Sequence, residues 1–136
     1  MRYLLDTDTV SEIRRGRDPS VAAWTASVAA ADLSLSVLTL GEIRSGVERL
    51  RARDPVQAAV FDTWLAELHS RFGGRILPVD ELVANRWGEL NAASPRKTVD
   101  SLIAATAHVH TLTVVTGNTR DFKGYGVPLV DPWQFA

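Results

Sequence analysis

Short apolar runs alternate with longer amphipathic segments along this chain of 136 residues. The short runs cover 2–5, 33–37, 76–79, 112–116 and 128–130, and their length and composition predict strands. Apolar positions three or four residues apart predict helices over about 9–16, 39–52, 55–72, 80–93 and 99–107, with another beginning after 18. Because strands alternate with helices, we expect an α/β layered domain with a mainly parallel sheet.

The chain contains no internal repeat, no low-complexity tract and no linker long enough to divide it. A length of 136 residues suits one domain, so we expect residues 1–136 to fold as a single unit. Asp6 and Asp8 interrupt the first apolar stretch, and no apolar run approaches the roughly 20 residues of a membrane span. We therefore expect neither a signal peptide nor contact with a membrane.

Cysteine is absent, which excludes disulfides and thiolate metal sites and fits a reducing compartment such as the cytoplasm. The net charge is −1, whereas a protein that simply coats nucleic acid is usually far more basic. Any contact with nucleic acid would therefore have to be local, or carried by a metal ion or a partner.

Acidic residues fall where the predicted strands end. Asp6 follows the first strand, Glu42 lies one turn into the helix after 33–37, and Asp121 follows the strand at 112–116. Ligands of open parallel sheets bind beyond the carboxyl ends of the strands. Asp100 begins the alanine-rich helix, so the fold would have to bring that helix terminus to the same edge. These four acids are our candidates for one site.

Carboxylates held within a few ångströms of one another repel, and a divalent cation relieves the repulsion. Mg²⁺ prefers oxygen ligands, and beside a phosphodiester it can lower the pKa of a water and stabilise the departing oxygen. Without cysteine, and with only three histidines, such a cluster favours Mg²⁺ or Mn²⁺ over Zn²⁺. Spacing alone does not separate such a site from ordinary surface acids.

Several of these residues also have simpler interpretations. Asp6 could only cap a helix, and an acid at Asp100 is favoured by the helix dipole in any case. For Asp8, capping is the favoured interpretation, and a contribution to the site is the alternative. Thr7 and Thr116 could orient carboxylates or merely pack.

Basic residues lie near the acidic motifs. Arg96 and Lys97 precede Asp100 and could meet RNA phosphates, or they could belong to a solvated loop. Two further groups could contact RNA or clamp an acidic partner: Arg14, Arg15 and Arg17 beside the first motif, and Arg44, Arg49 and Arg51 near the second.

Four segments together resemble PIN-domain proteins of the VapC toxin type, and within these the FitB-like subgroup. They read YLLDTDTVSEI (3–13), LSVLTLGEIRSGVERL (35–50), TVDSLIAATA (98–107) and VVTGNTRDFKGYGVPLVDPW (114–133). The resemblance spans essentially the whole chain, in the order typical of the family. It implies a three-layer α/β/α domain with a Mg²⁺-dependent site, Mn²⁺ being an alternative, that hydrolyses RNA phosphodiester bonds.

The resemblance also implies partners. It points to the toxin of a type II toxin–antitoxin pair that forms a homodimer. A VapB-like antitoxin would block the site with its tail, and it would bind operator DNA with its N-terminal part. This chain would therefore reach DNA only through the antitoxin.

The motifs of the family match Asp6, Glu42 in LGEI and Asp100 before LIAATA. For the fourth acid we favour Asp121, with Asn118 as a neutral site residue, although in some relatives the acid aligns with Asn118. Two positions depart from the usual pattern, since Asp8 stands where Asn is common and Gly117 where Arg or another polar residue is common.

Two other functions are compatible with an α/β chain. One is a PIN-fold module without nuclease activity that sequesters RNA or a protein, but the presence of every motif acid argues against it. The other is a receiver-type domain, which would offer paired acids, a phosphoacceptor Asp and a Lys on separate strands. We find no such set in this sequence.

Overall fold

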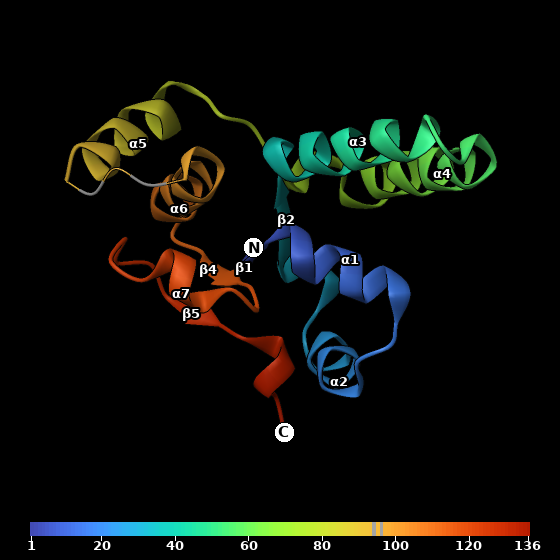
Figure 1. Ribbon diagram of the computed structural model, residues 1–136. Coiled ribbons are helices and arrows are strands. Elements are labelled where there is room, and N and C mark those ends of the chain that lie inside the picture. The colour runs from blue at the N-terminus through green and yellow to red at the C-terminus, as the bar shows by residue number, and fades with distance from the viewer. Residues whose placement is uncertain (94, 96) are drawn as a thin grey trace.

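A computed structural model of the protein describes residues 1–93, 95 and 97–136, so the predicted RNA contact of Arg96 lies outside the described residues. Five parallel strands form the central sheet in the order β3-β2-β1-β4-β5 (Figure 1). They are β1 (Tyr3–Leu5), β2 (Leu33–Ser36), β3 (Ile76–Leu77), β4 (Thr113–Val115) and β5 (Leu129–Val130). The parallel sheet predicted from the sequence is confirmed.

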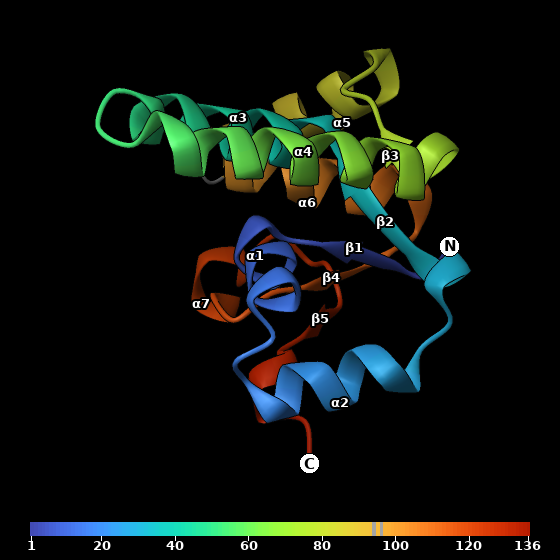
Figure 2. The same ribbon diagram turned by 90° about the vertical axis from the view of Figure 1, so that its right-hand side faces the viewer.

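Helices flank this sheet. They are α1 (Thr7–Arg15), α2 (Pro19–Ser27), α3 (Val37–Arg51), α4 (Pro55–Phe72), α5 (Glu81–Ala93), α6 (Thr98–His110) and α7 (Thr119–Phe122). Short 3₁₀ turns are η1 (Ala30–Asp32), η2 (Gly73–Arg75) and η3 (Pro132–Gln134). The α3–α4 pair and the α5–α6 pair lie on either side of β2 in Figure 1, and Figure 2, turned by 90°, shows the α3–α4 pair in front of the α5–α6 pair. Within the described part of the chain, no helix has both the length and the apolar character needed to cross a bilayer.

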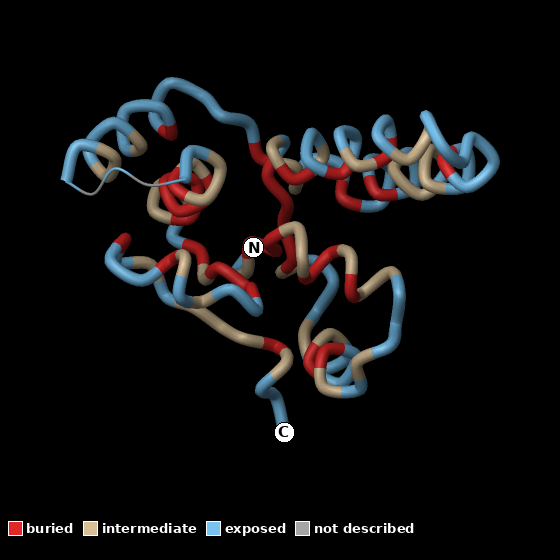
Figure 3. Tube along the Cα trace, in the orientation of Figure 1, coloured by how far each residue is buried: buried red, intermediate tan, exposed pale blue. Residues whose placement is uncertain are grey.

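The two faces of the sheet bury separate apolar cores, because successive side chains of a strand point to opposite faces. Leu5 and Val115 belong to the core shared with α1 to α4. Leu4 and Val114 belong to the core built with α6 and α7. Figure 3 shows the strands and the inner side of α6 as the main buried segments. Burial on both faces explains why the strands are mostly apolar, with Ser34 and Ser36 of β2 as buried polar exceptions.

The strand order reverses beside β1. The chain passes from β1 through β2 to β3 on one side, and then returns to β4 and β5 on the other. β1 and β4 are neighbours, with Leu5 opposite Val115. The crevice at such a switch point is where open α/β sheets bind ligands. Asp6 and Thr116 follow these two strands, so both residues stand at this crevice.

The first helix begins two residues earlier than the pattern predicts. Asp6 is its N-cap, with extended backbone angles and a carboxylate that accepts a hydrogen bond from the Thr7 N–H at 2.9 Å. The predicted capping role of Asp8 is therefore wrong, because Asp8 lies within the first turn. Gly16 ends the helix with φ of 65°, as its position predicts.

The alanine-rich helix is longer than predicted and includes His108 and His110 in its last turn. His108 Nε2 lies 2.6 Å from the carbonyl oxygen of Tyr125, which joins the end of α6 to the segment before β5. Asp100 lies in the first turn of α6, so these histidines are at the opposite end of the helix.

Candidate active site

A pocket of about 440 Å³ opens at the edge of the sheet where β1 and β4 end. Five carboxylates line it, from the start of α1 and from α3, α6 and α7: Asp6, Asp8, Glu42, Asp100 and Asp121. The four acids selected from the sequence thus share one pocket, together with Asp8. Lys97, Thr7 and Asn118 also line the pocket.

Asp6 lies deepest, with 7% of its surface exposed. Its Oδ1 accepts the Thr7 N–H, and its Oδ2 accepts the hydroxyl of Thr116 at 2.9 Å. The Thr116 oxygen in turn accepts the Asn118 N–H at 3.0 Å. Thr116 is fully buried, so it holds the Asp6 carboxylate and the start of the following loop in one arrangement.

Asp8 joins the first turn of α1 to the loop after β4. Its Oδ1 accepts the Thr9 N–H at 2.8 Å. Its Oδ2 accepts the Gly117 N–H at 3.0 Å and lies 3.4 Å from the Asn118 side-chain amide nitrogen, which donates to it. Both oxygens of Asp8 are thus used by the protein itself.

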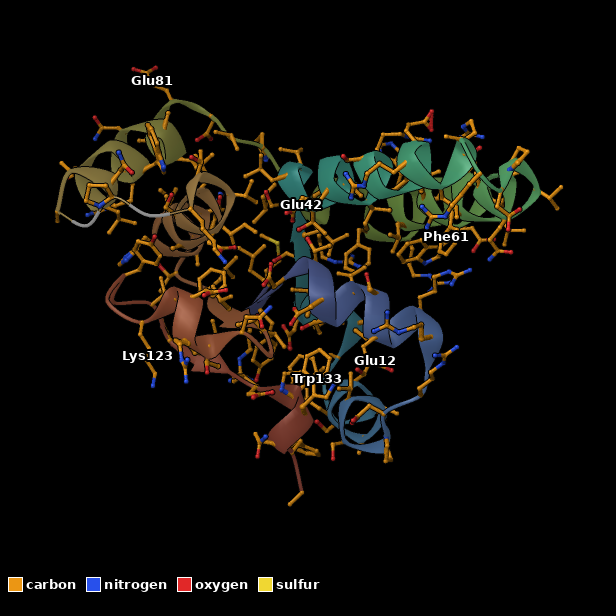
Figure 4. All side chains as sticks on the ribbon, viewed as in Figure 1. Glu12, Glu42, Phe61, Glu81, Lys123 and Trp133 are labelled. Atoms are coloured by element: carbon orange, nitrogen blue, oxygen red, sulfur yellow. The ribbon has the colours of Figure 1, made fainter. Side chains whose placement is uncertain are left out.

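Glu42 is exposed on α3, and its Oε1 accepts the hydroxyl of Thr7 at 2.6 Å. The same hydroxyl lies 3.5 Å from Oγ1 of the buried Thr39, one helical turn before Glu42. Figure 4 shows Glu42 near the end of α3 that lies above α1. Thr7 therefore connects the α3 carboxylate to the segment that carries Asp6.

The start of α6 and the short helix α7 also contribute polar residues to the pocket. Asp100 is in the first turn of α6, and Lys97 is the N-cap residue of the same helix. The Lys97 Nζ lies 3.6 Å from Oδ2 of Asp121 in α7. Lys97 therefore places a positive charge at the rim of an otherwise acidic pocket.

Burial and mutual repulsion raise the pKa values of three of the acids. The pKa of Asp6 rises from its usual 3.8 to about 6, mainly because the group is buried and then because Asp8 is charged; the Thr116 hydrogen bond opposes the rise. Burial also raises the pKa of Asp8, against the hydrogen bond from Gly117. For Asp100, burial and then the charge of Asp121 raise the pKa, and Lys97 lowers it.

The donor set suits a hard cation. The described lining residues offer carboxylate, hydroxyl and amide oxygens, and neither histidine nor cysteine is among them. Among residues 1–93, 95 and 97–136, no three acidic or histidine side chains converge closely enough to form a ready-made metal cage. Mg²⁺ keeps several of its waters and is usually bound directly by only one or two carboxylates, so the residues fit such an ion.

A second, more apolar groove of about 370 Å³ adjoins the acidic pocket, and Thr7 and Glu42 line both. It lies between α1, α3 and α4, and its lining includes Phe61, Trp64 and three arginines at positions 14, 15 and 53. The Arg14 guanidinium stands 4.2 Å from the centre of the Phe61 ring, which Figure 4 labels beside α4. The groove therefore combines an apolar floor with basic edges.

For Asp8 the sequence favoured capping and left a place in the site as the alternative; the structure places Asp8 in the pocket, and the loop contact that holds it was not predicted. The repeated Asp in DTD is the only signal in the sequence, and it is also what a helix cap looks like. The sequence also gave no sign that the Trp133 ring lies against Gly117 in the pocket loop.

Comparisons with known proteins find relatives in sequence and in fold. A family model described as PIN domain matches residues 3–127. The chain is 34% identical over 137 residues to Toxin FitB of Neisseria gonorrhoeae, covering 96% of this chain and 98% of that protein. It is 30% identical over 140 residues to VapC ribonuclease Y4jK of Sinorhizobium fredii, covering 98% and 99%. The crystal structure of FitAcB from Neisseria gonorrhoeae superimposes with a TM-score of 0.89 at 34% identity, covering 98% of this chain and 99% of that one.

Proposed function

This chain belongs to the PIN-domain family, and we propose that it is an endoribonuclease that uses Mg²⁺ or Mn²⁺ to hydrolyse RNA phosphodiester bonds. We further propose that it is the toxin of a type II toxin–antitoxin pair. The observation that carries the proposal is the meeting of five carboxylates in one pocket at the switch point of the sheet. Relatives named as a toxin and as a ribonuclease support it.

Asp6 and Asp100 are the residues that would hold the cation, directly or through water. Glu42 and Asp121 would complete the negative charge around it. When bound, the cation supplies a water of lowered pKa and offsets the negative charge that develops on the phosphodiester. The raised pKa of Asp6 indicates that this carboxylate is poorly compensated by the protein alone, and a cation would compensate it.

The remaining polar residues would orient these acids and the substrate. Thr116 and Thr7 hold the carboxylates of Asp6 and Glu42 through hydrogen bonds of 2.9 and 2.6 Å. Lys97 would contact an RNA phosphate from the pocket rim. Arg96 keeps its assignment as a second phosphate contact, which rests on the sequence.

The groove beside the pocket is where we place the tail of a VapB-like antitoxin. An acidic and apolar tail would complement the aromatic floor formed by Phe61 and Trp64 and the basic edge formed by Arg14. Because Glu42 lines both the groove and the acidic pocket, a tail bound in the groove would reach the pocket and block it. DNA would be reached only through the antitoxin.

The arginines of α3 that the sequence suggested for clamping the antitoxin are engaged within the protein. Arg44 and Arg51 both pair with Asp62 of α4, at 2.7 and 2.8 Å. Arg49 donates to the Ser45 hydroxyl at 2.8 Å. These internal pairs lead us to favour Arg14, which lines the groove, over the α3 arginines as the contact with the antitoxin.

We also propose a homodimer. The apolar residues Ile43, Val47 and Leu68 of α3 and α4 are buried in the core, so they are not available for a dimer contact. Exposed apolar side chains follow two neighbouring strands, with Val37 after β2 and Val79 after β3. Leu82, three residues beyond Val79 in α5, is 67% exposed. This patch is our candidate for the dimer contact.

The proposed activity is tested by incubating purified protein with total RNA and with synthetic RNAs in Mn²⁺, in Mg²⁺ and in a chelator, and by mapping the ends produced. We expect cleavage that the chelator abolishes. Replacing Asp6 or Asp100 by Asn should lower the rate by at least about 100-fold while leaving the circular dichroism spectrum unchanged.

Glu81→Gln is the matched control, because Glu81 is an exposed acid in the first turn of α5, away from the pocket (Figure 4). Cleavage at the wild-type rate by either Asn variant would refute the site. RNA binding without cleavage in any metal would instead favour a nuclease-inactive binding module.

A further inference from the structure

Gly117 occupies a position where no larger residue fits. A Cβ atom built there would stand 2.9 Å from Cε3 and 3.0 Å from Cζ3 of the Trp133 ring, and 3.2 Å from Oδ2 of Asp8. Cβ atoms essentially never lie within 3.0 Å of another heavy atom, so either the loop or the Trp133 ring would have to move.

The backbone of Gly117 serves the pocket directly. Its N–H donates to Asp8 Oδ2, the same oxygen that the Asn118 amide approaches. Asp8 is thereby tied to the loop after β4, one residue from Thr116, which holds Asp6. A displacement of this loop would move the supports of two pocket acids together.

Trp133 is itself held in place from two sides. Asp131 Oδ1 accepts the Trp133 N–H at 3.0 Å and begins the turn η3. Pro132 is buried, and η3 packs against α2. Figure 4 shows Trp133 at the start of the C-terminal segment, between β5 and α2. These contacts fix the backbone of Trp133, and its ring lies beside the Gly117 loop.

We infer that Trp133 is a positioning residue, whose ring presses the loop at Gly117 against Asp8 and so keeps the acidic side chains of the pocket at the spacing that binds a divalent cation. The effect of Trp133 on cation binding rests on the proposed function. The contact of its ring with the Gly117 loop, and of that loop with Asp8, is independent of the proposed function.

Two measurements on the full-length protein test the inference. Amide hydrogen exchange of Gly117 reports the Asp8 bond in metal-free protein, and calorimetric titration with Mn²⁺ reports cation affinity. In Trp133→Leu we expect exchange at Gly117 to quicken about 10-fold and Mn²⁺ to bind about 10-fold more weakly. Trp133→Phe keeps an aromatic ring and should lie closer to wild type than to the Leu variant.

Gly117→Ala should weaken Mn²⁺ binding in the wild-type background because its Cβ collides with the ring. In a Trp133→Leu background, Gly117→Ala should weaken Mn²⁺ binding by a smaller factor, because the ring with which its Cβ collides is absent. This non-additivity is the signature of direct contact, and a merely structural role for Trp133 would not produce it.

Two controls separate positioning from general destabilisation. Gly88→Ala introduces a Cβ with nothing within 4 Å, and Phe72→Leu removes a buried ring at the end of α4. Neither should alter Mn²⁺ affinity. Unchanged Gly117 exchange and Mn²⁺ affinity in Trp133→Leu, or strictly additive effects of the two substitutions, would overturn the inference. A wild-type protein that binds no Mn²⁺ would overturn the proposed function instead, and Gly117 exchange would still decide the contact.

Discussion

The hydroxyl of Thr7 donates a 2.6 Å hydrogen bond to Oε1 of Glu42, across 35 residues of sequence. Thr7 follows the N-cap Asp6, and Glu42 lies in the second turn of α3. The bond joins the segments that follow two neighbouring strands, β1 and β2. It also gives an exposed carboxylate a defined direction that its own helix does not provide.

Replacing Thr7 by Val keeps the shape of the side chain and removes this bond. Because residues that orient metal-binding carboxylates typically contribute 10- to 100-fold, we expect RNA cleavage to fall by roughly that factor. Thr7→Ser retains the hydroxyl and should stay near the wild-type rate. Equal rates for the Val and Ser variants would show that the direction of Glu42 is unimportant.

Asp6 makes the stability of the metal-free protein depend on pH. Its carboxyl titrates near 3.8 when unfolded and near 6 when folded, so between these values the folded state binds more protons. Stability from this group is fully present below about pH 4 and is lost as the pH rises through 6. At pH 8 the ionised carboxylate costs about 2 to 3 kcal/mol.

Asp6→Asn should therefore be inactive yet more stable than wild type at pH 8, by about 2 to 3 kcal/mol, in urea titrations with a chelator present. The advantage should shrink as the pH falls through 4 and vanish at about pH 3 and below, where the wild-type carboxyl is largely neutral in both states. Asn also caps helices well, so the cap of α1 is retained. An Asn variant that is less stable than wild type at pH 8 would contradict this account.

Lys97 should contribute to RNA affinity through charge. Replacing it by Met removes one phosphate contact, so the slope of log affinity against log salt should become shallower by about 0.7 for single-stranded RNA. The measurement uses an uncleaved complex of Asp100→Asn protein with labelled RNA. Lys123→Met, on an exposed residue outside the pocket, is the matched control and should leave the slope unchanged.

Arg14 should matter for the antitoxin more than for catalysis. Arg14→Ala removes a cation from the groove and uncovers the ring of Phe61. We expect the complex with the antitoxin, co-produced from the reading frame beside the toxin gene, to weaken at least about 10-fold. Cleavage by the free variant should be preserved. An unchanged complex together with lost cleavage would instead assign the groove to RNA.

Leu82 should decide the oligomeric state. A charged side chain at the proposed contact is desolvated on association, so Leu82→Glu should run as a monomer in size-exclusion chromatography with light scattering. Val56→Glu is the control, because Val56 is 78% exposed at the start of α4 and lies outside the patch. A wild-type protein that is monomeric at high concentration would refute the dimer.

Local sequence was sufficient to predict most elements of the fold, although not the short helix α7. Gly16, Asp18-Pro19 and Gly73 mark helix ends through backbone conformations and caps that depend on neighbouring residues alone. The alternation of short apolar runs with helices predicted a mainly parallel sheet, because parallel strands need crossover connections. The positions of Asp6, Glu42 and Asp121 after strands predicted a shared pocket, since parallel strands end at one edge of the sheet.

Only the tertiary structure decided which side chains support that pocket. Asp8 and Gly117 are 109 residues apart, and no local pattern distinguishes a carboxylate that caps its own helix from one that accepts a distant N–H. The same holds for the arginines, since pairing of Arg44 with Asp62 depends on how α3 and α4 pack. Secondary structure follows from interactions between neighbours, whereas hydrogen-bond partners of polar side chains follow from which elements the fold brings together.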